Sequence, residues 1–510
     1  MFWTEEQKEI IKSKERLLVI NACAGSGKTS TLLGIMKSNK NSRILYLVFN
    51  SSMKKESEEK IKKYKFYNTQ VKTGHGLAYK YFGRMNELGN ISYLDIANYF
   101  QWGSSASKRG YLRILYSYYK LYLQSSEKNL EEFLELDLEN LLLKLKVYIK
   151  NINKKILIEH MEKIWLGMEN GQIKMSHDFY LKYYQLSNIV ENNFDIVLLD
   201  EAQDTNDIMI NIMENKFPNA RKIIVGDHNQ SIYAWRGAVN AMEYFESLAY
   251  AKSLNLTNSF RIGNDTANTA NDIINIKSER KFQIKGLNYK QKISLNIDEK
   301  KQFTYLARTN SALFEYAVNN MDKKFFFNSK VSFEILYEVY FLYIKEKNKI
   351  KNLVLKEYYD FESLKFHVEQ EALEDVEIRI AVKVVDKYKE DTLKHLKILE
   401  RNTTKNTEAN VILSTVHASK GLEYEKIILA DDYINILKVK DKIENLKNKI
   451  REEKLLGESI VLYKLINKLK ELEAWFVEEC NILYVAVTRS FGEIKLNKSL
   501  LTLQEKPFTY

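Results

Sequence analysis

A segment of small residues near the start of the chain has the composition needed to hold the phosphates of a nucleotide. It reads Ala22-Cys23-Ala24-Gly25-Ser26-Gly27-Lys28-Thr29, between an apolar run at 16–21 that predicts a buried strand and a helical pattern at 30–36. Small residues let backbone N–H groups approach phosphate oxygens, and the following helix dipole favours their negative charge. Lys28 would contact the β and γ phosphates, and the Thr29 hydroxyl would hold Mg²⁺. The other nucleotide contacts predicted here are Ala24, Gly25, Ser26, Gly27 and Ser30.

A second predicted strand supplies the acids that such a site needs. Residues 194–199 form a buried apolar run, and Asp200-Glu201-Ala202-Gln203-Asp204 follow it directly. Parallel sheets bind ligands at the carboxyl ends of their strands. We therefore expect Asp200 to hold Mg²⁺ and Glu201 to act as the base for a water that attacks the γ phosphate. The same acids alone would also suit the first turn of a capped helix. Together with the segment around Lys28, they predict an NTPase.

Several further motifs follow in a fixed order along the chain. A strand at 221–225 leads into Gly226-Asp227-His228-Asn229-Gln230-Ser231-Ile232-Tyr233-Ala234-Trp235-Arg236-Gly237-Ala238. Later segments read Leu256-Thr257-Asn258-Ser259-Phe260-Arg261, Leu306-Ala307-Arg308-Thr309-Asn310, Thr415-Val416-His417-Ala418-Ser419-Lys420-Gly421-Leu422-Glu423 and Asn481-Ile482-Leu483-Tyr484-Val485-Ala486-Val487-Thr488-Arg489. With these motifs the chain resembles the UvrD/PcrA/Rep helicases of superfamily 1A. Among them it looks most like the helicase part of F-box DNA helicases, which also matches at Val48-Phe49-Asn50-Ser51, Lys72-Thr73-Gly74-His75-Gly76-Leu77-Ala78-Tyr79 and Arg236-Gly237-Ala238-Val239-Asn240-Ala241.

The resemblance implies further contacts with ATP. Gln7 matches a glutamine that reads adenine, and Phe260 matches an aromatic that stacks on the base. Gln230, Arg261 and Arg489 match contacts to the γ phosphate, with the two arginines expected on different lobes. A planar, always charged guanidinium suits a phosphoryl group that gains charge in the transition state. Glu423 matches a contact on the nucleotide side.

The resemblance also implies a path for single-stranded DNA. Phe49, Tyr233 and Trp235 match aromatics on which bases stack, and stacking accepts any base. Thr73, His75, Arg236 and His417 match residues that contact the strand. Phe49 and Tyr233 would also suit plain core packing. Because stacking does not read the sugar, an RNA strand stays open as a substrate.

The expected fold is α/β, with two RecA-like, doubly wound P-loop NTPase lobes and helical inserts. The first lobe takes residues 1–75 and 185–265, interrupted by a helical insert at 76–184 with patterns at 111–123 and 130–149. The second lobe takes 266–330 and 400–510, interrupted by a small insert at 331–399. Apolar residues at a spacing of three or four between 434 and 476 predict two amphipathic helices in a hairpin. We favour packing of this hairpin on its own lobe over a coiled coil that binds a partner.

Composition limits the remaining choices. The 510 residues carry a net charge of +11, which favours polyanions such as nucleic acid, although biased codon usage would give the same excess. No membrane contact is expected, because no apolar run approaches the ~18 residues of a spanning helix. Two cysteines fit a reducing compartment, cytoplasmic in a bacterium or virus and nuclear in a eukaryote.

The expected activity is an ATP- and Mg²⁺-dependent 3′→5′ translocase and helicase acting on single-stranded DNA and tailed or forked duplex. The alternative is an ATP-gated DNA-binding regulatory subunit, in anti-phage defence or anti-recombination, with little unwinding of its own. Such a subunit would have a protein partner, a nuclease or a recombination protein. The order of the motifs does not choose among repair, defence and replication.

Overall fold

The computed structural model describes residues 3–102, 106–136, 153–233, 240–278, 282–329, 331–370, 376–455 and 460–504. The chain divides into two compact units. Unit 1 consists of Met1–Ala22 and Gly27–Leu256, and unit 2 of Cys23–Ser26 and Thr257–Tyr510. The division after Leu256 falls before the expected lobe boundary at 265, so Arg261 lies in the same unit as Arg489 rather than in a different one.

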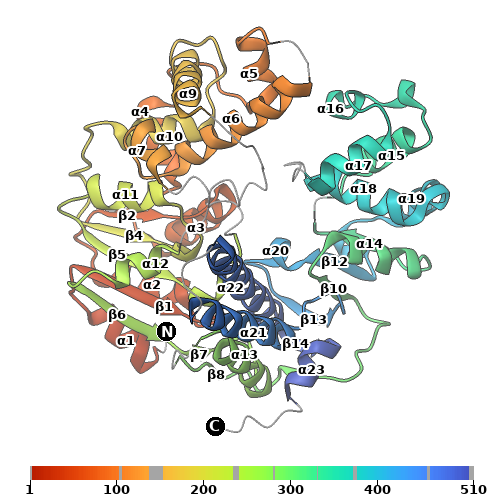
Figure 1. Ribbon diagram of the computed structural model, residues 1–510. Coiled ribbons are helices and arrows are strands. Elements are labelled where there is room, and N and C mark those ends of the chain that lie inside the picture. The colour runs from red at the N-terminus through yellow and green to blue at the C-terminus, as the bar shows by residue number, and fades with distance from the viewer. Residues whose placement is uncertain are drawn as a thin grey trace. The chain divides into compact units, whose positions relative to one another are not determined.

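Unit 1 is built on a six-stranded parallel sheet with the order β3-β2-β4-β5-β1-β6 (Figure 1). The strands are β1 (Leu17–Ala22), β2 (Ile44–Leu47), β3 (Thr69–Lys72), β4 (Ile196–Leu199), β5 (Arg221–Gly226) and β6 (Ala251–Leu256). The strands predicted at 16–21, 194–199 and 221–225 are confirmed to within two residues, because their apolar runs are buried on both faces of the sheet.

Helices cover both faces of this sheet. They are α1 (Glu5–Lys12), α2 (Lys28–Ser38), α3 (Ser51–Tyr64), α4 (Gly74–Phe82), α10 (His177–Leu186), α11 (Asp207–Asn215) and α12 (Ala241–Glu246). Alternate residues of β1 point to opposite faces. Leu18 and Ile20 pack in one core cluster with α1, α2 and α3, whereas Leu17 and Val19 pack in another with α4, α10, α11 and α12. The predicted helix at 30–36 lies inside α2.

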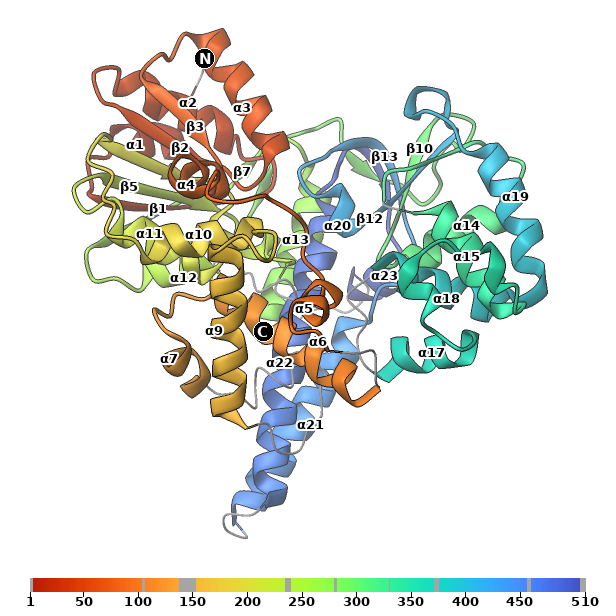
Figure 2. The same ribbon diagram turned by 90° about the horizontal axis from the view of Figure 1, so that it is seen from above.

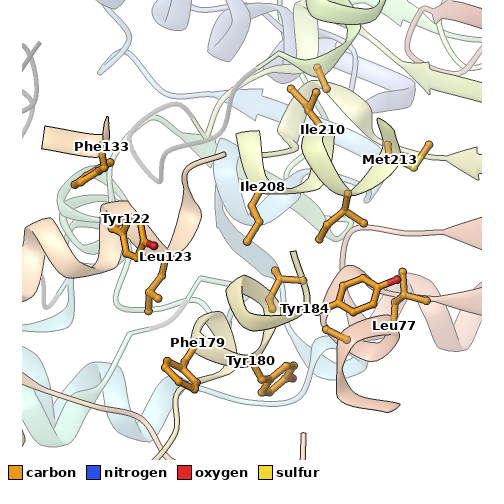
Figure 3. Packing of buried hydrophobic residues seen from close by; sticks show 14 of the residues in the cluster. Leu77, Tyr122, Leu123, Phe133, Phe179, Tyr180, Tyr184, Ile208, Ile210 and Met213 are labelled. Atoms are coloured by element: carbon orange, nitrogen blue, oxygen red, sulfur yellow. The ribbon is translucent and has the colours of Figure 1, made fainter. Parts of the chain in front are cut away.

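The predicted insert at 76–184 is helical where it is described. Its other helices are α5 (Tyr93–Tyr99), α6 (Ala106–Gln124), α7 (Leu130–Glu135) and α9 (Lys154–Glu169). Figure 3 shows how side chains from α4, α6, α7, α10 and α11 form one buried cluster, so the insert shares its core with the sheet. The pattern at 111–123 lies within α6. Of the pattern at 130–149, α7 covers the start, and 137–149 lie outside the described residues.

Unit 2 has its own six-stranded parallel sheet, with the order β11-β12-β10-β13-β14-β9. Its strands are β9 (Lys292–Ile293), β10 (Phe303–Ala307), β11 (Phe325–Phe327), β12 (Val411–Thr415), β13 (Tyr424–Leu429) and β14 (Ser490–Lys495). A short parallel pair, β7 (Asn258–Ser259) and β8 (Lys285–Gly286), stands apart from it. The helices beside these strands are α13 (Asn264–Lys277), α14 (Asn310–Asn319), α20 (Val416–Ser419) and α23 (Lys498–Gln504). Two parallel sheets with helices confirm the α/β class.

Two helical additions belong to unit 2. The predicted insert at 331–399 covers α15 (Phe333–Tyr343), α16 (Leu353–Lys356), α17 (Phe361–Gln370), α18 (Val376–Tyr388) and most of α19 (Thr392–Asn402). The predicted hairpin is confirmed as α21 (Ile436–Leu455) and α22 (Ile460–Val487), which run side by side (Figure 2). Leu446, Ile450 and Leu462 form its buried seam. The second helix is longer than predicted, because it continues past residue 476 into the last motif and ends at Val487.

Candidate functional site

The segment between β1 and α2 is shaped by two glycines and by close packing. Gly25 and Gly27 have φ values of +73° and +80°, a region in which side chains are strained. A Cβ on Gly25 would also lie 2.5 Å from Cβ of Arg261. Within unit 2, Phe260 N–H donates to the Gly25 carbonyl over 2.9 Å and the Ser259 hydroxyl donates to the Ala24 carbonyl over 2.6 Å. The loop therefore lies directly against the Ser259–Arg261 motif.

Lys28, Thr29 and Ser30 form the first turn of α2, after a left-handed Gly27. Lys28 Nζ lies 2.7 Å from Glu201 Oε1, and both side chains are mostly buried. Burial lowers the pKa of Lys28, but the carboxylates of Glu201 and Asp200 more than offset this, and the pKa lies above its ordinary value. The predicted phosphate lysine and the two predicted acids therefore lie together.

Asp200 stands at the carboxyl end of β4 and is held by two donors. The Tyr46 hydroxyl donates to Oδ2 over 2.6 Å, and the backbone N–H of Glu201 donates to Oδ1 over 2.9 Å. Burial first, and then the neighbouring charge of Glu201, raise the pKa of Asp200 above its usual range. A cation nearby would stabilise the ionised form of this carboxyl. Among the described residues no group of three or more His, Cys, Asp and Glu side chains could hold a metal. The predicted ligands, the Thr29 hydroxyl and the Asp200 carboxylate, fit Mg²⁺, which takes one or two protein ligands and fills its shell with phosphate oxygens and water.

Gln203 joins the acid segment to the segment after β5, a link that the sequence analysis missed. Its Nε2 donates to Glu201 Oε2, and its Oε1 accepts the Asp227 N–H over 3.0 Å. A Cβ at Gly226 would lie 2.3 Å from the same Oε1, so glycine there permits the approach. Gln230 Nε2 in turn donates to Asp227 Oδ2 over 2.8 Å. The signal was present, because Gln203 lies inside the quoted acid motif.

Glu201 has a backbone conformation that indicates strain. Its φ of +52° lies in the left-handed region, which non-glycine residues adopt rarely. The cost is about 1–3 kcal/mol and is typical of functional sites. The bonds of Glu201 to Lys28 and Gln203 hold it there.

The two residues predicted to bind the adenine base, Gln7 and Phe260, differ in how far they are buried. Gln7 is buried in α1, where its Oε1 accepts the Thr4 N–H over 3.1 Å in a capping box. The Phe260 ring is 49% exposed, although its backbone N–H donates to Gly25 in the segment between β1 and α2. An exposed ring beside this loop suits stacking on a base.

The two arginines predicted to contact the γ phosphate, Arg261 and Arg489, both lie in unit 2, and Arg261 contacts the residue before Arg489. Arg261 Nε lies 3.0 Å from Glu423 Oε2, and its Nη1 donates to the Thr488 carbonyl over 3.3 Å. Arg489 is only 1% exposed, and its guanidinium donates to the carbonyls of Val485 and Leu422 over 3.0 and 3.3 Å. Arg261 thus touches the predicted nucleotide-side Glu423 and the residue before Arg489.

The described DNA residues predicted in unit 1 lie on loops that follow its strands, except His75, which lies in the first turn of α4. The rings of Phe49 and Tyr233 stack with centroids 6.1 Å apart, and Phe49 is 41% exposed, which argues against plain core packing for it. Thr73 caps α4 by accepting the Gly76 N–H over 3.0 Å, and His75 Nε2 lies 3.0 Å from Asp178 Oδ1. Trp235 and Arg236 lie outside the described residues.

In unit 2, His417 is half-buried in α20. A further arginine of unit 2, Arg308, forms a bidentate ion pair with the buried Glu479 at 2.7–3.2 Å. This pair ties the end of β10 to α22. No role follows for Arg308 from its motif, and the structure gives it an ion-pair partner.

Comparison with known proteins agrees with this geometry. Residues 3–249 match the UvrD/REP helicase N-terminal domain. This region belongs to the UvrD/REP helicases. It contains Gln7, the segment at 22–29 that is predicted to bind phosphates, the acids Asp200 and Glu201, and Gln230. The resemblance drawn from the motifs is therefore confirmed.

The chain is also similar to named proteins beyond that region. It is 26% identical over 532 residues to F-box DNA helicase 1 of Gallus gallus, covering 98% of this chain and 49% of the relative. It is also 26% identical over 560 residues to F-box DNA helicase protein 1 of Schizosaccharomyces pombe, covering 98% and 58%. ATP-dependent DNA helicase PcrA of Staphylococcus epidermidis is 39% identical over 106 residues, 20% of this chain and 13% of PcrA. The chain thus spans about half the length of the F-box relatives. In the described ranges, no helix has the length and apolar character to cross a membrane.

Proposed function

We propose that this UvrD/REP chain is an ATP-dependent DNA motor that moves 3′→5′ along single-stranded DNA and unwinds tailed or forked duplex. The observation that carries the proposal is the cluster of Lys28, Asp200 and Glu201, with 2.7 Å between Lys28 Nζ and Glu201 Oε1. These groups stand at the carboxyl ends of β1 and β4, and β5 between them ends in the segment with Gln230. The relatives named as DNA helicases support DNA as the substrate.

Each group has a chemical role in this proposal. Lys28 and the N–H groups of Ala24, Gly25, Ser26, Gly27, Thr29 and Ser30 would bind the phosphates. Thr29 and Asp200 would hold Mg²⁺, which neutralises phosphate charge when bound. The Lys28 ammonium can donate to a phosphate oxygen. That oxygen would compete with Glu201 for the ammonium, and Glu201 would be released. The released Glu201 carboxylate would then accept a proton from the attacking water.

The remaining nucleotide contacts come from charge and ring chemistry. Gln230 would contact the γ phosphate, and its hydrogen bond to Asp227 would position its side chain for that contact. Arg261 and Arg489 would stabilise the negative charge that develops on the transferred phosphoryl group. Phe260 would stack on the base, with Gln7 and Glu423 as further nucleotide contacts.

The DNA strand would contact the aromatic pair Phe49 and Tyr233, and Trp235 and Arg236 remain predictions. Thr73, His75 and His417 would contact the strand as well. We propose that the two units correspond to RecA-like lobes, with 76–184 and 331–399 as inserts. Each parallel sheet carries predicted functional residues at its carboxyl edge, which supports this proposal.

A second candidate function is an ATP-gated DNA-binding regulatory subunit with little unwinding of its own. It is favoured by the short insert at 331–399 and by the exposed apolar side chains Leu455, Val461 and Tyr463 next to the tip of the hairpin. Its partner would be a nuclease or a recombination protein.

One experiment separates the two candidates. ATP hydrolysis is measured with and without single-stranded DNA, beside strand separation on duplexes with a 3′ or a 5′ tail. Stimulated hydrolysis with unwinding only from the 3′ tail supports the helicase. Stimulated hydrolysis without unwinding supports the regulatory subunit, and hydrolysis that ignores DNA contradicts both.

A further inference from the structure

Two grooves border the edge of the sheet in unit 1, and the ATP and DNA chemistry above uses neither. Among the strands that the structure describes, β3 is the last on this side and pairs only with β2 (Figure 2). One groove has a volume of about 490 Å³ and lies on the side of α4. The other, of about 390 Å³, lies on the side of α3. Tyr67, Thr69, Gln70 and Lys72 line both, so the grooves flank the same edge strand from opposite faces of the sheet.

The backbone of β3 has hydrogen-bonding groups that point away from the sheet. Ile44 N–H donates to the Asn68 carbonyl and Val48 N–H to the Lys72 carbonyl, each over 2.9 Å. In a parallel pair, alternate residues face the neighbouring strand. Asn68, Gln70 and Lys72 therefore face β2, and Val71 turns its N–H and C=O outward. Among the described strands, none pairs with β3 on that side. Val71 is only 5% exposed, and a sheltered peptide group without a partner is costly.

Both grooves are cationic with apolar floors. Arg43, Lys72 and Lys80 line the first, and Lys54, Lys62 and Lys72 line the second. Each contains one acid. Glu191 is buried and accepts the Tyr81 hydroxyl over 2.9 Å, and Glu58 lies 3.5 Å from Lys54. A ligand with carboxylates is therefore favoured in both grooves.

We propose that this edge binds an extended acidic segment of another protein, which adds to the sheet beside β3. Successive side chains of an extended peptide point to opposite faces, so they would enter the two grooves in turn. The outward N–H and C=O of Val71 match a peptide group, which offers both an acceptor and a donor. A nucleic acid phosphate only accepts and leaves the carbonyl without a partner. The side chain of Tyr67 is 85% exposed and would cover the bound strand.

The test begins with the full chain as bait for a displayed library of short random peptides. We expect selected peptides to be extended and rich in Asp and Glu. A selected peptide is then resynthesised with N-methyl groups at alternate residues, which keeps its charges and removes its backbone donors. Fluorescence anisotropy should show that methylation in one of the two registers weakens binding by about tenfold or more, as expected for one or two backbone hydrogen bonds.

Protein variants locate the site. Lys62→Glu and Lys72→Glu should each weaken binding several-fold, whereas Lys63→Glu, on the same helix as Lys62 but outside the grooves, should not. Val71→Pro removes the outward N–H without removing a bond to β2, and edge strands accept proline. If Val71→Pro fails to fold, the methylated peptides still test the backbone pairing.

Three results would overturn the proposal. One is a library that yields no binder. Another is a set of binders that tolerate N-methylation in both registers and are indifferent to Lys62→Glu. The third is displacement of the peptide by oligothymidine whose own affinity depends on Lys62 and Lys72, because the grooves would then bind nucleic acid.

Discussion

Replacing Glu201 by Gln separates the chemistry of the site from its stability. The substitution keeps the shape of the side chain and its acceptor oxygen, but it removes the carboxylate that can take a proton. Loss of a general base costs about 10²- to 10⁴-fold in rate, or about 3–5 kcal/mol in the barrier. The effect on folding is smaller, because Lys28 keeps the neighbouring Asp200 charge and an amide oxygen at 2.7 Å, and only the hydrogen bond that Gln203 donates to Glu201 Oε2 is lost. We expect it to cost about 1–2 kcal/mol in the free energy of unfolding.

The assay is single-turnover ATP hydrolysis in saturating oligothymidine, beside binding of a fluorescent ATP analogue and urea unfolding. The expected result is bound nucleotide with turnover slowed at least about a hundredfold. Glu159→Gln is the matched control, because Glu159 lies 2.6 Å from Lys163 in an exposed ion pair outside the site. It should leave turnover unchanged. Normal turnover in Glu201→Gln would refute the assignment of the base, and loss of nucleotide binding would show that Glu201 serves mainly to place Lys28.

Three further predictions follow from named contacts. Lys28→Ala should abolish hydrolysis while DNA affinity, measured by anisotropy, stays within about twofold, because Lys28 pairs with Glu201 and is predicted to contact phosphates, not DNA; retained hydrolysis would contradict the assignment of the loop. Phe49→Ala and Trp235→Ala should each weaken oligothymidine binding by about 1–3 kcal/mol irrespective of sequence, and unchanged affinity would place that ring outside the strand path. Burial lowers the pKa of Lys182 to about 7, so the unfolded state binds more protons above that pH and the unfolding free energy should rise between about pH 7 and 10; Lys182→Met should flatten this slope, and an equal slope in both proteins would show that Lys182 keeps its ordinary pKa.

The parts of the fold that could be predicted are those specified by local pattern. The apolar runs of β1, β4 and β5 are too continuous for surface strands, and the spacing of Ile443, Leu446 and Ile450 fits one face of a helix. The unit boundary was harder to place. Ser259 and Arg261 follow β6 at once, but their contacts are with Cys23–Ser26, Glu423 and Thr488. Contacts over such sequence distances leave no local pattern.

The same reason explains which site residues were missed. Lys28, Asp200 and Glu201 follow predicted strands, so the edge of a parallel sheet brings them together. Tyr46 reaches Asp200 across 154 residues, and Arg308 reaches Glu479 across 171. Neither has a residue type or spacing that marks it. Side-chain pairing of this kind depends on the final packing and not on a motif.

Gln203 gives the proposed coupling of hydrolysis to DNA movement a physical route. Its amide uses Nε2 for Glu201 and Oε1 for the Asp227 N–H, and its backbone carbonyl accepts the Ser231 hydroxyl over 3.0 Å. The residue is fully buried, so its side chain cannot rotate without leaving at least one polar group unpaired. A movement of Glu201 during turnover would therefore be passed to Asp227 and Ser231. Ser231 stands two residues before Tyr233, whose ring stacks on Phe49, so the chain and these hydrogen bonds connect the proposed base Glu201 to the proposed strand contact.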